Sequence, residues 1–163
     1  MSDSINLDEL TKELTDNRLL KTNEEAEKFE AVLTEIINKK DISHIEVLCR
    51  GFYDETEKDE VMFGVIHAIE SYDQEYPLEA VLKRLAYAIP AMIPHAYVWL
   101  EILHKRILNH EEPKRVYANV IKDIGNQNTI EIIEKQLNEI KHKNPRKFKM
   151  TASYVLNVIK GKD

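Results

Sequence analysis

The feature that most constrains this sequence is the spacing of its apolar residues, which recur three and four positions apart along almost the whole chain. Val61, Val65, Ile66 and Ile69 form one such stripe, and the alternation expected of a half-buried strand is nowhere sustained. Only 4 Gly and 5 Pro occur among the 163 residues, which disfavours a turn-rich β fold. We therefore expect one all-α domain covering residues 1–163, a length at which a sizeable core can be buried.

Start signals divide this helical pattern into about nine helices. The signals are side chains that cap helix N-termini and prolines suited to the first helical turn. The expected starts are Ile5, Thr22, Asp41, Thr56 (with Asp59 as a capping-box partner), Pro77, Pro94, Pro113, Asn128 and Asn144-Pro145. Gly125 suits the C-terminal cap of the seventh helix. We expect residues 1–22 to form an N-terminal helix that is packed more loosely than the rest.

The expected starts are regularly spaced. Ile5, Asp41, Pro77 and Pro113 follow one another at intervals of 36 residues, and each interval holds two helices. Antiparallel helical hairpins with such a period are typical of stacked repeat proteins. The side chains differ between intervals, so the repeat is one of layout. Two architectures therefore remain open, a short α-solenoid-like (HEAT-like) stack and a compact helical bundle.

Cysteine content and hydropathy predict a cytoplasmic protein. The single cysteine, Cys49, excludes an internal disulfide and suits a reducing compartment. The first residues have neither the basic start nor the apolar run of a signal peptide. The longest run without Asp, Glu, Lys or Arg is 85–100, which contains two prolines and is shorter than the ~20 apolar residues of a membrane span.

The sequence contains no motif that predicts catalysis. Phosphate-binding glycine loops are absent from a chain with four glycines, and Cys49 lies in an apolar stretch typical of a core residue. Glu60, His67 and Glu70 share one helix face and have the donor atoms of a divalent-metal site. A solvated or partner-facing helix surface explains this face more simply. We therefore predict a non-enzyme without cofactor or metal, and keep a metal-dependent helical enzyme as a third hypothesis.

Charge is distributed unevenly along the chain. The net charge of −6 argues against general nucleic-acid binding, which depends on phosphate neutralisation by Lys and Arg. Residues 53–80 contain nine acidic residues and one basic residue, whereas residues 101–163 carry an excess of bases. The basic tail makes nucleic-acid contact a minor option; its bases include Lys141, Lys143, Arg146, Lys147 and Lys149.

Five acids form what we call the acidic ridge, namely Asp54, Glu55, Glu57, Asp59 and Glu60. Acids at a helix N-terminus complement its dipole, which explains two or three of them. The excess suggests a basic protein partner, although a solvated acidic loop has the same composition. Phe63, an aromatic among these acids, is either an interface anchor or a core residue. The predicted partner-binding residues are Asp54, Glu55, Glu57, Asp59, Glu60, Phe63, His67, Glu70 and Asp73.

Two stretches resemble the bacterial immunity protein 30 family. The first is CRGFYDET at 49–56, followed by EVMFG at 60–64, His67 and Glu70; the second is IPHA at 93–96 with Trp99 and ILH at 102–104. The resemblance runs from about residue 23 to the end of the chain. It implies an all-helical antidote that neutralises the toxin of a polymorphic-toxin or contact-dependent system in the producing cell and its kin.

These observations lead to one functional prediction. We expect a non-enzymatic immunity protein that binds a cognate toxin through its acidic surface, and therefore a toxin with a basic surface, as nucleases have. Neither a membrane nor a nucleic-acid partner is expected. A helical-repeat adaptor that binds another protein partner is the alternative.

Overall fold

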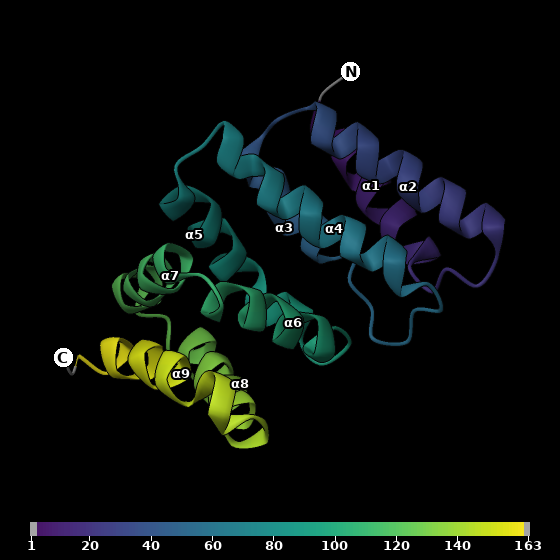
Figure 1. The fold of residues 1–163 in the computed structure, drawn as a ribbon. Helices are drawn as coiled ribbons and strands as arrows, with labels where there is room; N and C mark the ends of the chain where they lie inside the picture. Colours follow the sequence, from purple (N-terminus) through teal and green to yellow (C-terminus); the bar gives the residue numbers. More distant parts are fainter. Residues whose placement is uncertain (1–2, 162–163) are drawn as a thin grey trace.

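The computed structural model describes residues 3–161, and the side chains of residues 7–161. The described residues form nine α-helices, three short 3₁₀ helices and no strand, which confirms the all-α prediction. The α-helices are α1 (Asp3–Asn17), α2 (Asn23–Asn38), α3 (Ile45–Cys49), α4 (Asp59–Ser71), α5 (Leu78–Ala88), α6 (Tyr97–Leu108), α7 (Glu111–Ile124), α8 (Gln127–Lys143) and α9 (Pro145–Ile159) (Figure 1). The 3₁₀ helices are η1 (Ile42–His44), η2 (Tyr72–Gln74) and η3 (Ile89–Met92).

The helices pack in two rows that run across the molecule (Figure 1). In the odd-numbered row, α3 packs against α5, α5 against α7 and α7 against α9. In the even-numbered row, α2 packs against α4 and α6 against α8. Successive helices such as α1 and α2, or α8 and α9, join the rows as hairpins. Helices two apart in the sequence thus pack together at most steps, although α1 with α3 and α4 with α6 are not among these packed pairs.

Several of the expected helix boundaries are confirmed in detail. Thr22 accepts a hydrogen bond from the backbone N–H of Glu25, whose side chain accepts one from the N–H of Thr22, so the two form a capping box. Asp41 caps η1, and Asn144 caps α9. Gly125 ends α7 with a φ of 61°, in the left-handed region that glycine adopts without strain.

Other expected starts are wrong, and each error has a local cause. Helix α4 begins at Asp59, not at Thr56, because residues 54–58 are held in a turn by other parts of the fold. Helix α6 begins at Tyr97, three residues after Pro94, and its first amides are satisfied by a side chain far away in sequence. Helix α8 is capped by Asn126, two residues before the expected Asn128.

The starts predicted at Pro77 and Pro113 differ from the observed starts of α5 and α7 by one or two residues. Pro77 lies at the N-cap of α5, immediately before the helix, while α7 begins at Glu111, two residues before Pro113. Neither residue interrupts a hydrogen bond there, because the first amides of a helix have no partner within it. The expected layout of paired helices is therefore retained although its boundaries shift.

The predicted apolar stripe of α4 and Cys49 are buried in the core, together with Trp99. Trp99 is 3% exposed and stacks on Phe52, with ring centroids 6.0 Å apart. Cys49 is 1% exposed, and burial raises the pKa of its thiol to about 12. A thiol that stays protonated is a poor nucleophile, so Cys49 behaves as a small apolar core residue.

A buried polar network connects α6, α7 and α8. The Gln136 side-chain amide donates to the Tyr97 carbonyl at 2.8 Å, which leaves its oxygen to accept from Nδ1 of His104 at 2.6 Å. Nε2 of His104 then accepts from the Tyr117 hydroxyl at 2.6 Å. His104 and Gln136 are at most 1% exposed, so the network satisfies both nitrogens of the neutral imidazole inside the core, where a charged ring would lose its hydration.

This network predicts a loss of stability in mild acid. Burial lowers the pKa of His104 from 6.5 to about 4, so between these values the unfolded chain binds a proton that the folded chain does not. The free energy of unfolding should therefore fall as the pH decreases from 7 to 5, by on the order of 2 kcal/mol for this group. Urea denaturation at both pH values measures the change. The His104→Leu variant should show a smaller decrease, and an equal decrease in both proteins would contradict the assignment.

Candidate functional site

The acidic ridge begins in a loop that is anchored to the start of α6. The Asp54 backbone N–H donates to the His95 carbonyl at 2.8 Å. The Asp54 carboxylate accepts from the N–H groups of Val98 at 3.1 Å and Trp99 at 3.4 Å, and so supplies the N-terminal cap that α6 lacks in its own sequence. The Trp99 indole N–H donates back to the Tyr53 carbonyl at 3.1 Å.

The other side of this loop is anchored near the N-terminal hairpin. The Glu57 N–H donates to the Leu19 carbonyl at 2.8 Å, between α1 and α2. The Arg18 guanidinium lies 4.8 Å from the centre of the Tyr53 ring and donates to the Arg50 carbonyl at 3.0 Å. The loop is therefore fixed on both sides, which leaves it little conformational freedom to lose on binding.

The structure separates the five acids of the ridge into two kinds. Asp54 is half-buried and its carboxylate is used inside the fold. The other four side chains are exposed and make no hydrogen bond or ion pair within the described part of the chain; they are Glu55, Glu57, Asp59 and Glu60. Sequence reasoning grouped all five because it could not see the backbone amides that Asp54 caps.

Helix α4 extends the ridge as an exposed strip. Glu60, Phe63, His67 and Glu70 all face solvent along this helix. Phe63 combines the two roles considered for it, because it is 37% exposed while its ring packs edge-on against Trp99 at a centroid distance of 5.2 Å. Asp73 is exposed in η2, just beyond the end of α4.

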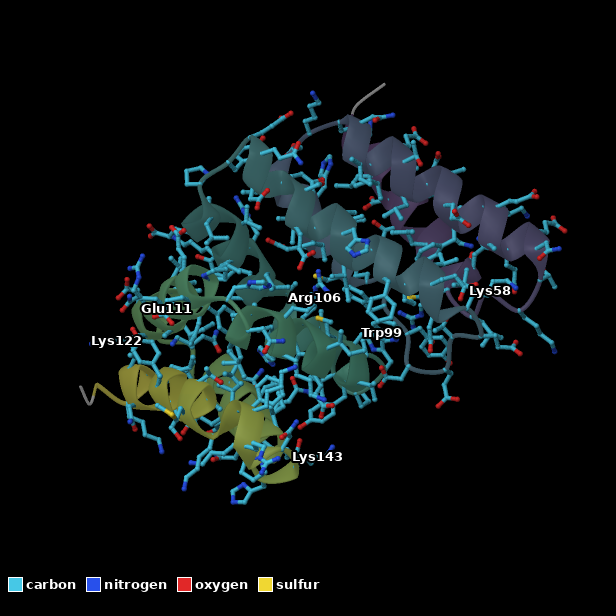
Figure 2. The ribbon with its side chains drawn as sticks, viewed as in Figure 1. Lys58, Trp99, Arg106, Glu111, Lys122 and Lys143 are labelled. Atoms are coloured by element: carbon cyan, nitrogen blue, oxygen red, sulfur yellow. The ribbon has the colours of Figure 1, made fainter. Side chains whose placement is uncertain are left out.

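The charge of Glu70 is paired with that of Arg106. Its two carboxylate oxygens accept from Nε and a terminal nitrogen of Arg106 in α6, each at 2.8 Å. This hydrogen-bonded pairing raises the pKa of the Arg106 guanidinium. Figure 2 shows Arg106 where α6 faces α4, so this bidentate pair links α4 to α6.

A groove between α2 and α4 adds acids that the sequence analysis missed. It has a volume of about 480 Å³. Its residues are Asn23, Ala26, Glu27, Glu30, Leu33, Lys58, Glu60, Val61 and Gly64. Glu27 and Glu30 are exposed, and neither side chain has an ion-pair partner among residues 7–161. Their three-residue spacing on the polar face of α2 is visible in the sequence, but only packing places that face beside Glu60.

The residues considered for metal binding do not form a metal site. Among the described side chains, no group of three or more His, Cys, Asp or Glu residues is arranged to hold an ion. Glu70 is already paired with Arg106. A Glu-x-x-His spacing occurs at Glu101–His104 and at Glu139–His142. Both ring nitrogens of His104 are occupied within the core, and the Glu139 carboxylate accepts from the Tyr97 hydroxyl.

The basic tail lies at the other end of the molecule. Lys58 and Lys143, both labelled in Figure 2, mark the acidic and basic ends and are far apart. Lys143 is paired with Glu101 at 3.4 Å. Four further bases near the turn between α8 and α9 have no ion-pair partner within residues 7–161; they are Lys141, Arg146, Lys147 and Lys149. No helix among residues 3–161 is long and apolar enough to cross a membrane.

The described residues form an all-α protein with exposed acidic residues on α2, on α4 and in the loop before α4. The chain belongs to the immunity protein 30 family, because the sequence model of that family matches residues 16–117. That membership implies an immunity role, and immunity proteins generally act without catalysis. The match includes the whole ridge and α4, and it ends within α7. We expected the resemblance to run to the end of the chain, but residues 118–163 lie outside the match. No curated protein and no solved structure matches the chain.

The role of Asp54 leads to a stability prediction. The Asp54→Ala variant should lose the cap of α6 and the anchor of the loop, which lowers the free energy of unfolding by about 1–2 kcal/mol. The neighbouring Glu55→Ala variant is the control and should change stability by less than about 0.5 kcal/mol, because its side chain makes no contact of this kind. Chemical denaturation followed by circular dichroism measures both. Equal stabilities for the two variants would contradict the capping role.

Proposed function

We propose that the protein neutralises a cognate toxin by binding it with the acidic ridge and the exposed strip of α4. The observation that carries the proposal is the state of the loop at 50–58. Backbone and side-chain hydrogen bonds fix it to His95, to the first turn of α6 and to the segment between α1 and α2. Glu55 and Glu57 are exposed and have no partner among the described side chains. A rigid loop that presents unpaired carboxylates is suited to hold a basic surface at a small entropic cost.

The neighbouring groups support the same face. Glu27 and Glu30 of α2 add charge beside Glu60, so the acidic field spans two helices. Phe63 presents part of an aromatic ring within this field, and its contact with Trp99 holds the ring in place. Aromatic side chains of this kind, surrounded by charges that guide the approach, are frequent energetic centres of protein interfaces.

The charge of this face indicates the class of toxin. A partner that binds it should carry Lys and Arg at its own binding site, as enzymes that act on nucleic acids do. We therefore propose a nuclease toxin of a polymorphic-toxin or contact-dependent system as the partner. Neutralisation would take place in the cytoplasm of the producing cell, by covering the surface with which the toxin binds its substrate and without a catalytic step.

Co-expression tests the proposal directly. A candidate toxin gene, sought next to the gene of this protein, is induced in a susceptible host with and without the present protein. The two proteins are then purified through a tag on one of them. We expect restored growth and a stable complex. Continued growth arrest, or a toxin that purifies alone, would contradict the proposal and favour an adaptor with another protein partner.

Charge reversal tests the surface. The Glu55→Lys/Glu57→Lys variant should weaken toxin binding on the order of tenfold or more and reduce its salt dependence, because it removes attraction at the anchored loop. The matched control is Glu112→Lys/Asp123→Lys, which makes the same change of charge on exposed positions of α7. Isothermal titration at two salt concentrations measures both. If the two variants bind equally well, the ridge is not part of the interface.

A further inference from the structure

A second depression lies between the two rows of helices, at the Glu70 end of the exposed strip of α4. Its volume is about 410 Å³. Residues from α4 to α7 form it, namely Ile69, Glu70, Asp73, Leu78, Val81, Leu82, Leu85, Leu103, Arg106, Ile107, His110 and Pro113. Most of its wall is aliphatic, and the charged residues Glu70, Asp73 and Arg106 lie at its rim.

The depression lies beside the contacts that join α4 to α6. Where α4 and α6 approach each other, they are joined by the contact of Phe63 with Trp99 and by the pair between Glu70 and Arg106. Beside that pair the buried face of α5 is reached from outside. Val81, a residue of this face, is 4% exposed and lies in the pocket wall.

An aliphatic pocket of this size is a favourable place for an apolar group. Protein interiors are close-packed and leave few such spaces. Water inside it would find few hydrogen-bonding partners, so an apolar group that replaces the water gains free energy. The volume lies in the range of ligand-binding pockets.

The rim specifies the chemistry of the occupant. Asp73 is exposed and has no ion-pair partner among the described side chains, while Glu70 is held in place by Arg106. Glu70 also ends the exposed strip that starts at Glu60 on α4. One partner that lies along this helix would therefore meet the ridge at one end and the pocket at the other.

We propose that this pocket receives an apolar side chain of the toxin, and that a basic residue next to that side chain pairs with Asp73. This inference rests on the proposed function, since it assigns the toxin a second anchor point on the same face. It goes further by dividing the interface into a charged region that guides approach and an aliphatic socket that slows dissociation.

Thiol labelling tests the occupancy of the pocket. Cys49 is 1% exposed, so an introduced cysteine would be the reactive thiol of the chain. Leu78 is half-buried in the pocket wall, and Tyr87 is 48% exposed on the same helix outside the pocket. Purified toxin should slow the labelling of the Leu78→Cys variant at least tenfold and leave the Tyr87→Cys variant unchanged. Equal rates with and without toxin at Leu78→Cys would overturn the proposal.

Two further variants test its contribution to affinity. Val81→Phe fills the pocket from within, and Asp73→Lys reverses the charge at its rim without disturbing the core. Each should weaken toxin binding about tenfold or more, whereas the control Asp123→Lys should bind like the parent protein. Thermal denaturation shows whether the Val81→Phe variant folds. If this variant is unfolded, the affinity of Asp73→Lys, a change at an exposed position, tests the proposal by itself. Unchanged affinity for Asp73→Lys and for a folded Val81→Phe would overturn the proposal.

These outcomes separate the pocket from the proposed function. If the parent protein does not bind the toxin, the proposed function fails. If the parent binds tightly but Leu78→Cys remains equally reactive, only the pocket proposal fails. Native mass spectrometry of the purified protein adds a third outcome. A bound amphiphilic small molecule that toxin does not displace would overturn the proposal, because the pocket would then have another occupant.

Discussion

A hairpin of two short amphipathic helices cannot bury its apolar face by itself, and this constraint determines how the molecule is built. Each hairpin therefore packs on the next, so that α5, for example, is covered by α3 and by α7. Stacking of this kind produces two rows with connecting loops along their margins. It also leaves a space between the two rows, the pocket formed by residues from α4 to α7.

Side chains and loops of different hairpins are joined by hydrogen bonds, including one cap at the start of a helix. Asp54 lies before α4 but caps α6, and the Trp99 indole returns a hydrogen bond to the Tyr53 carbonyl. The interior of the second half is joined in a comparable way, because His104 in α6 is satisfied by Tyr117 in α7 and Gln136 in α8. These long-range bonds fix the loop at 50–58, and so the acids within it are held in position before any partner arrives.

The charges of the molecule are divided between its ends. Acids gather on α2, on α4 and in the loop before α4, whereas unpaired bases gather where α8 meets α9. Such a division gives the protein an electric dipole. The dipole favours the approach of a basic partner to the acidic end. The family match covers the acidic end and ends within α7, so the features used in the proposed function lie within the part that is typical of immunity protein 30.

The sequence by itself determined the helical class, the paired layout and the caps at Thr22, Asp41 and Asn144, because periodicity and capping are local properties. It also located the acidic ridge as a set of charges. Only the tertiary structure decided which of these charges are free. Asp54 and the acids around it look alike in sequence, yet its carboxylate meets amides that lie more than forty residues away. The pocket and the acidic groove likewise depend on how helices are placed in space, which no local pattern records.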